Sequence, residues 1–147
     1  MSVRERRMPF DAVGFSSEAK VQNPPAPSSR LRALWQAFQR GVRRASDRGD
    51  LVASIAMLEE ARTLIEDEDR WIQGRYLKNG RRCAMGALQE AGRHYRRGVR
   101  RDAVTELLKV ARIRGHHSIE SMNDNISHRE VVVAFDTAIA GIVARRA

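Results

Sequence analysis

Apolar side chains recur at the spacing of an amphipathic helix in five segments from residue 30 onward. Asp50 directly follows the first segment and can cap the second helix, and Asp102 can cap the fourth. The last segment opens with Ser127 and Glu130, whose spacing is that of a capping box. We therefore expect helices over 30–48, 50–66, 84–91 and 102–115, and one from 127 onward.

The hydrophobic period changes between the second and third of these helices, in the stretch 71–92. Asn79-Gly80 is the dipeptide that most favours a tight β-hairpin, because both residues tolerate positive φ. Gly74 suggests a bulge or a close approach of another segment. Gly86, inside the third helix, suggests that another backbone packs against that face, and Gly92 is placed to end the helix in the left-handed conformation.

The pattern as a whole predicts a mainly α (α+β) fold, with about five helices and one small β-hairpin between helices two and three. A chain of 147 residues is long enough for one domain with its own core. We expect this single helical domain to cover 30–147. Residues 1–29 contain three closely spaced prolines and show no apolar period, which predicts a disordered, proline-containing tail.

The chain is basic, with 27 Lys and Arg against 18 Asp and Glu, a net charge of +9. The charge is uneven: 50–70 is acidic, whereas 71–115 carries twelve basic residues against three acidic ones. Such a field favours anionic partners. The candidate polyanion-binding residues form two clusters, Arg93, Arg96, Arg97, Arg100 and Arg101, and Arg40, Arg43 and Arg44.

The first cluster lies in a loop-like run that also holds Tyr95, which could stack on a nucleic-acid base. The other interpretation is an exposed connection that keeps the protein in solution. The second cluster lies on the helix predicted over 30–48, which also carries Trp35 and Phe38. This helix either docks its aromatic stripe on the core or lies on nucleic acid, a partner groove or a membrane surface as a peripheral contact.

Cys83 is the only cysteine, which excludes an internal disulfide and a cysteine-rich zinc site and fits a reducing compartment. No apolar run reaches the ~18 residues of a membrane span, and the first residues lack the apolar segment of a secretory signal, so we expect none. We therefore expect a cytoplasmic protein. His116 and His117 are adjacent and make a poor metal pair, so we expect neither a metal nor a cofactor. The oligomeric state stays open.

Two classes of function remain. One is a non-enzymatic binding or regulatory module that contacts nucleic acid or an acidic protein. The alternative is a cysteine-dependent enzyme, because Cys83 opens a helix after two arginines and both features lower a thiol pKa. A buried cysteine among alanines is also an ordinary core residue. The residues of the catalytic alternative are Cys83, His117 as base (or His94, His116 or His128), and Asn123 or Asp124 as orienting group.

Three short motifs follow one another along the chain: W-x-Q-G at 71–74, G-x-x-C-A-x-G-A-L at 80–88, and Asn123-Asp124 before a helix that contains D-x-A-I at 136–139. Together they resemble the motifs of a family of small bacterial proteins classed as a domain of unknown function. The resemblance covers about 50–143 and implies fold boundaries but no activity. We interpret its motif residues as structural: Trp71, Gln73, Gly74, Cys83, Gly86, Asn123 and Asp124.

Overall fold

The computed structural model describes residues 29–147, except for the side chains of 44–46. The tail predicted for 1–29 lies outside the described residues, apart from Ser29. Over residues 29–147 the fold is mainly α, with five α-helices and one two-stranded hairpin, which confirms the predicted fold class. The hairpin lies between the segments predicted as the second and third helices, also as expected.

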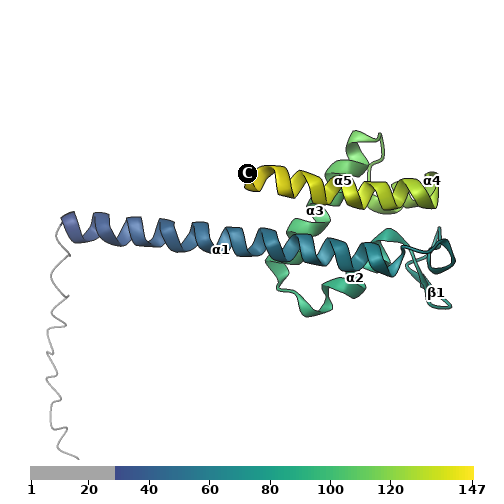
Figure 1. Ribbon diagram of the computed structural model, residues 1–147, viewed down its shortest axis with the longest axis horizontal. Helices are drawn as coiled ribbons and strands as arrows, with labels where there is room; N and C mark the ends of the chain where they lie inside the picture. The colour runs from purple at the N-terminus through teal and green to yellow at the C-terminus, as the bar shows by residue number, and fades with distance from the viewer. Residues whose placement is uncertain (1–28) are drawn as a thin grey trace, which may run out of the picture.

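Helix α1 (Ser29–Leu64) is a single helix of 36 residues, so the predicted break between 48 and 50 is wrong. No proline interrupts this region, and one internal glycine such as Gly49 costs a helix only about 1 kcal/mol. Asp50 lies inside the helix, and its carboxylate forms an ion pair with Arg96 instead of capping a helix. Figure 1 shows the N-terminal half of α1 projecting beyond the other helices.

The aromatic stripe on this projecting half does not dock on the core. Trp35 and Phe38 are both exposed, and their rings stack on each other with centroids 5.7 Å apart. The interpretation of this segment as an ordinary core-docking helix is therefore wrong. The core-facing residues of α1 begin near Leu51.

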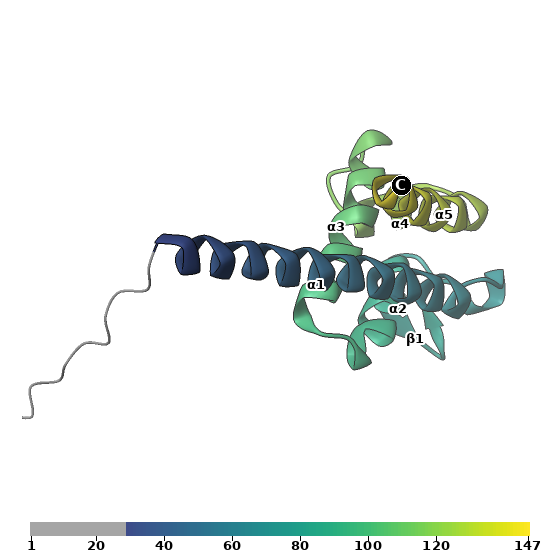
Figure 2. The ribbon, with the colours of Figure 1, turned by 60° about the vertical axis from the view of Figure 1, so that its left-hand side comes forward.

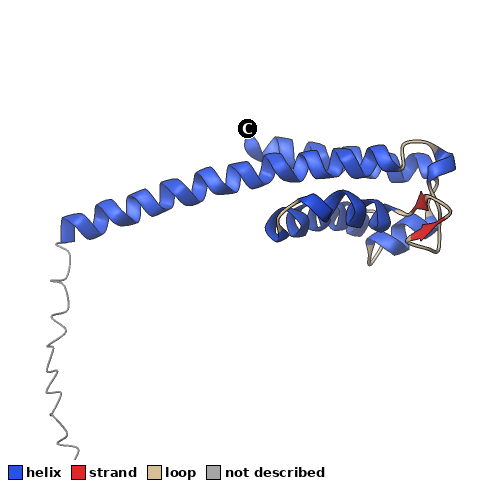
Figure 3. Cartoon of the chain, turned by 90° about the horizontal axis from the view of Figure 1, so that it is seen from below, coloured by secondary structure: helices blue, strands red, loops and turns tan. Residues whose placement is uncertain are grey.

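The hairpin forms where Asn79-Gly80 predicts it. A 3₁₀ turn, η1 (Glu68–Arg70), leads into strands β1 (Leu77–Lys78) and β2 (Arg81–Arg82), which pair antiparallel. Asn79 and Gly80 both have positive φ, at 51° and 78°. Figure 3 shows the hairpin at the end of the fold away from the start of α1.

Gly86 confirms the predicted close approach of a backbone. A Cβ at Gly86 would lie 2.0 Å from the carbonyl oxygen of Tyr76, which no side chain tolerates. The same carbonyl accepts a hydrogen bond from the Cys83 amide, at 3.3 Å. The glycine therefore lets the start of the hairpin pack directly on the next helix.

The remaining helices are α2 (Ala84–Ala91), the 3₁₀ turn η2 (Gly92–His94), α3 (Arg97–Ile113), α4 (Ile119–Asn125) and α5 (His128–Arg146). Helix α3 starts five residues before the predicted cap Asp102, and α4 is a helix that the apolar pattern did not predict. Gly92 has a right-handed φ of −68°, so the left-handed ending predicted for it is wrong. The capping box of Ser127 and Glu130 is confirmed.

The core lies where the second half of α1 packs against α2, α3 and α5. Figures 1 and 2 show α5 on one side of α1, with α2 and the hairpin on the other. Phe135 is the largest fully buried side chain, and small or aliphatic residues fill most of the remaining core. Extensive apolar burial in this region supplies the main driving force for folding.

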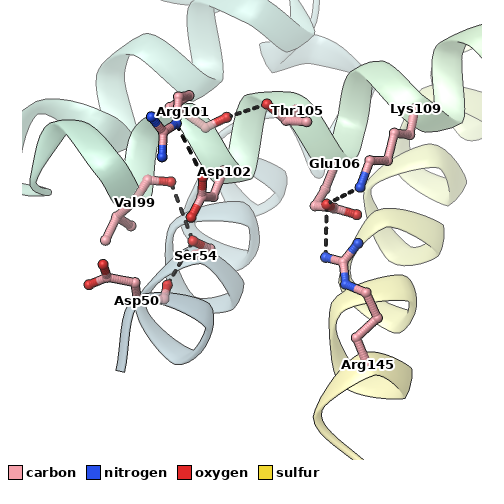
Figure 4. A network of polar contacts seen from close by, with 9 residues as sticks. All are labelled: Asp50, Ser54, Val99, Arg101, Asp102, Thr105, Glu106, Lys109 and Arg145. Carbon is pink, nitrogen blue, oxygen red and sulfur yellow. Dashed lines mark hydrogen bonds and ion pairs between the residues drawn. The ribbon is translucent and has the colours of Figure 1, made fainter. Parts of the chain in front are cut away.

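Two polar contacts join α3 to its neighbours inside this packing (Figure 4). The hydroxyl of buried Ser54 in α1 lies 3.3 Å from the carbonyl oxygen of Val99. The carboxylate of Glu106 accepts from Lys109 at 2.7 Å and from Arg145, near the end of α5, at 2.8 Å. These contacts fix α3 between the other two long helices.

Candidate functional site

A buried carboxamide, that of Asn123 in α4, joins three separate segments of the chain. Its Oδ1 accepts hydrogen bonds from the Trp71 indole N–H at 2.7 Å and from the Ala84 amide at 3.0 Å. Its Nδ2 donates to the carbonyl oxygen of Ile72 at 3.0 Å and to Asp124 at 3.1 Å. All four hydrogen-bonding positions of the carboxamide are therefore occupied within the protein.

The loop 71–74 makes further contacts with the same helix end. The Gln73 side chain donates to the carbonyl oxygens of Asn123 and Ile126, each at 3.1 Å. The Gly74 amide donates to the Asp124 carboxylate at 2.8 Å. Gly74 has a φ of +72°, and a Cβ there would meet nothing within 4 Å, so conformation and not crowding favours glycine.

Cys83 caps the N-terminus of α2 and is buried. Its Sγ accepts a hydrogen bond from the Gly86 amide at 3.3 Å. Burial raises the pKa of the Cys83 thiol above its ordinary value, and the nearby carboxylates of Asp124 and Glu120 act in the same direction. The backbone amides of Gly86 and Met85 favour the thiolate but are too weak to reverse this, so the thiol form is favoured at neutral pH.

A cavity of about 180 Å³ lies beside this thiol. Within the described part of the chain, no histidine lines it, although all four histidines fall in that part. The structure therefore brings Cys83 and Asp124 to one cavity but does not bring His117 there. The Asn123 carboxamide already uses all of its hydrogen-bonding positions in the contacts described above, so it is not free to orient a base. The residues that line the cavity are Gly74, Arg75, Tyr76, Cys83, Glu120 and Asp124.

His128, another candidate base, lies at the start of α5 and does not line this cavity. Its ring packs against the Trp71 indole with centroids 5.5 Å apart, and its Nε2 lies 2.7 Å from the carbonyl oxygen of Ile65. These contacts hold the end of α1 against the start of α5. Across residues 29–147, no group of three or more His, Cys, Asp or Glu side chains could hold a metal ion.

A shallow groove of about 540 Å³ lies between α2 and α3. Its floor is apolar, since it contains Met85 and Val104, both half-buried, above the buried side chains of Met57 and Leu88. Three residues of the predicted basic cluster line the groove, namely Arg97, Arg100 and Arg101. Among the described residues, Arg97 and Arg100 form no ion pair, and the guanidinium of Arg101 pairs only with its neighbour Asp102, at 3.4 Å.

The other two arginines of this cluster have partners outside the groove. Arg93 pairs with Glu90 at 3.3 Å, and Arg96 pairs with Asp50 of α1. Tyr95 is half-buried, and its hydroxyl donates to Glu60 at 2.8 Å. Burial of Tyr95 and this bond to Glu60 raise the pKa of the phenol to about 12.

The second basic cluster lies apart from the groove, on the projecting half of α1. Arg40 and Arg43 are exposed there, whereas the side chain of Arg44 lies outside the described part of the structure. Sequence reasoning found the arginines of both clusters but missed the apolar floor of the groove. Met85 and Val104 belong to different helices. A sequence pattern within either helix cannot predict that the two helices pack side by side.

The structure is a small, mainly helical fold in which the loop 71–74 and the start of α2 are hydrogen-bonded to the short helix α4. The chain belongs to the family of unknown function DUF6197, whose family model matches residues 50–141. This match confirms the predicted membership of such a family. It begins within α1 and takes in the Asn123 contacts, Cys83 and the groove, but leaves out the projecting part of α1. No curated protein and no solved structure matches the chain.

Proposed function

We propose that this chain is a non-enzymatic binding module that receives an acidic, amphipathic segment of a protein partner in the groove between α2 and α3. The observation that carries the proposal is the combination of an apolar floor with Arg97 and Arg100 at its rim. A helix with one apolar and one acidic face complements such a groove on both counts. The adaptable methionine Met85 suits a surface that accommodates a partner's side chains.

The contacts around the groove favour an acidic protein over nucleic acid. Stacking on bases needs an accessible aromatic ring, and the ring of Tyr95 is half-buried with its hydroxyl engaged by Glu60. Arg93 and Arg96 already have acidic partners. The cations that remain lie beside apolar surface, which a phosphate backbone does not complement.

We further propose that the motif residues around Asn123 serve folding rather than binding or catalysis. Their polar groups are paired with one another and with the backbone of the loop 71–74. The cysteine-dependent alternative needs a base at the Cys83 cavity. Of the residues that the structure describes, the cavity offers the carboxylates of Asp124 and Glu120 but no imidazole.

Methyl resonances of the methionines provide the test, with Met85 as the reporter in the groove. The full chain is titrated with a synthetic Glu/Leu amphipathic helix, with polyglutamate and with duplex DNA. We expect the amphipathic helix to shift the Met85 signal and to bind more tightly than polyglutamate. The double variant Arg97→Gln/Arg100→Gln should weaken this binding at least roughly tenfold, since two rim charges are removed.

The matched control is Arg112→Gln/Arg129→Gln, which removes two exposed arginines away from the groove and should leave binding unchanged. If DNA shifts Met85 and the peptide does not, the nucleic-acid interpretation replaces ours. Binding should then fall with salt at a log–log slope of about −0.9 per phosphate contact. A Met85 signal that none of the three probes moves would overturn both.

A further inference from the structure

The projecting part of α1, residues 29–49, carries a continuous apolar stripe in the open. Leu34, Trp35, Phe38 and Val42 are 67%, 61%, 62% and 52% exposed. Every residue of 29–43 and 47–49 is exposed as well. We call this segment the α1 extension. Isolated apolar residues on a surface are common, but a stripe of four large ones along one helix indicates a binding face.

The extension separates its apolar and cationic residues onto different faces. At about 100° of rotation per residue, the four stripe residues fall within an arc of roughly 100°. Arg32, Arg40 and Arg43 fall on the opposite half of the helix by the same arithmetic. The extension holds six arginines and one aspartate, a net charge of +5. This is the composition of a helix that lies in the interface of an anionic bilayer, with its apolar face toward the acyl chains.

The stripe also faces away from the folded part of the molecule. The core-facing residues of α1, among them Ser54, Leu58 and Ala61, lie roughly 140° around the helix from the centre of the stripe. Val52, which is 47% exposed, lies on the same side of α1 as the stripe. The stripe therefore lies on the side of α1 away from these core-facing residues, and a flat surface can reach it along the exposed extension.

Charge decides between the candidate occupants of this face. A second copy packed on the stripe would cover the apolar residues but leave the arginines of each extension with only Asp47 as an acidic partner within it. An anionic phospholipid surface offers negative charge along the full length of the helix, about 30 Å at 1.5 Å per residue. Trp35 and Phe38 are also residues that favour the boundary between headgroups and acyl chains.

We propose that the α1 extension lies flat on an anionic phospholipid surface, with Leu34, Trp35, Phe38 and Val42 buried at the headgroup boundary. The contact is peripheral. None of the helices in the described part of the chain is long and apolar enough to cross a bilayer. The proposal does not depend on what occupies the groove between α2 and α3.

Flotation of the full chain with vesicles tests this directly, using phosphatidylcholine alone and phosphatidylcholine with about a quarter phosphatidylglycerol. We expect binding to the anionic vesicles and little binding to the neutral ones. Trp35→Ser/Phe38→Ser should weaken binding at least roughly tenfold, because two buried anchors are lost. Arg40→Gln/Arg43→Gln should weaken it roughly thirtyfold, at about a factor of five for each cation near the surface.

Two control variants make the same kinds of substitution outside the α1 extension. Ile113→Ser removes an exposed apolar side chain at the end of α3, and Arg129→Gln removes an exposed cation of α5. Both should bind as the wild type does. Tryptophan emission should shift to the blue on binding, and this shift should disappear in Trp35→Phe, which retains Trp71.

Three results would overturn the proposal. The first is no binding to anionic vesicles. The second is binding that leaves the emission of Trp35 unchanged, because the stripe would then stay in water. The third is a dimer in sedimentation equilibrium that Trp35→Ser/Phe38→Ser dissociates, because a second copy would then cover the stripe.

Discussion

At the scale of single residues, Asn123 stands out because one atom of its side chain accepts hydrogen bonds from two separate segments of the chain. The Trp71 indole N–H and the Ala84 amide both donate hydrogen bonds to its Oδ1. Leaving a buried donor without an acceptor costs about 1–3 kcal/mol. The loop 71–74 and the start of α2 therefore both depend on this carboxamide.

Asn123→Ala should lower the free energy of unfolding by about 2–6 kcal/mol, the sum for two unpaired donors. Urea denaturation followed by circular dichroism measures this. The matched control is Asn125→Ala, two residues away, where an exposed Nδ2 donates to the carbonyl of Ser121. It should cost less than about 1 kcal/mol. Equal losses in the two variants would contradict the role given to Asn123.

Cys83 should react slowly with a thiol reagent in the native protein at neutral pH and quickly after denaturation, because it is buried and its pKa is raised. The raised folded pKa gives a contribution to stability that is fully present below the unfolded pKa of about 8.5. This contribution is lost as the pH rises toward the folded pKa. The stability difference between the wild type and Cys83→Ala should therefore shrink above that pH.

Fast modification of native Cys83 would contradict this prediction and would reopen the cysteine-dependent alternative. Asp124→Asn then becomes the informative variant, because Asp124 shares the cavity with Cys83. If Asp124→Asn does not change the rate of thiol modification, the Asp124 carboxylate does not activate the thiol.

At the scale of elements, the contact between α3 and α5 through Glu106 makes a second prediction about pH. Burial raises the pKa of Glu106, but the hydrogen bonds from Arg145 and Lys109 outweigh it, so the pKa lies below its ordinary value. A depressed folded pKa gives stability that is present above the unfolded pKa of about 4.3 and is lost as the pH falls through the folded one.

Glu106→Gln should therefore cost about 1–3 kcal/mol at neutral pH, because it removes a charged acceptor of two hydrogen bonds. The difference from the wild type should disappear in acid. Thermal denaturation across this pH range measures it. Glu59→Gln is the matched control, since its exposed carboxylate forms no ion pair with the described residues. Its melting temperature should follow the wild type at every pH.

Elements with a strong local signal could be predicted from the sequence. The Asn79-Gly80 turn, the Ser127 capping box and the close approach at Gly86 each depend on one or two residues. Asp50 misled the prediction because a helix-capping residue and a residue that pairs with a distant arginine look the same in sequence. Helix α4 was missed because the short polar residues at the end of its SIESMNDN segment are typical of a turn. The structure shows instead that Ser118 caps a helix there.

The candidate sites likewise contain some features that the sequence predicts and others that depend on how the helices pack. The arginines of the groove were found because charge is visible in the sequence. That Arg97 and Arg100 border an apolar floor whereas Arg96 pairs with α1 depends on helix packing. The same holds for Cys83 and His117, whose separation no spacing along the chain could reveal.

At the scale of the whole molecule, α1 is packed at one end and exposed at the other, which makes a prediction for hydrogen exchange. A helix without tertiary contacts is only marginally stable in water. Backbone amides of 34–46 should therefore exchange orders of magnitude faster than those of 57–64, which lie in the core. Mass spectrometry of peptides from the two halves measures this.

Anionic vesicles should slow exchange in 34–46 and leave 57–64 unchanged. Neutral vesicles are the control and should change neither segment. Strong protection of 34–46 in dilute protein without vesicles would contradict the prediction, because it would require a packed partner for this half.

Since α1 has no break, the number of residues between Val42 and Ser54 determines how the folded part of the molecule is oriented toward any surface that the stripe contacts. Adding one residue there would turn the stripe by about 100° relative to the core, whereas adding four would turn it by only about 40°. The length of this segment therefore sets the angle about the helix axis between the stripe and the core. This angle determines which side of the folded part points away from the surface.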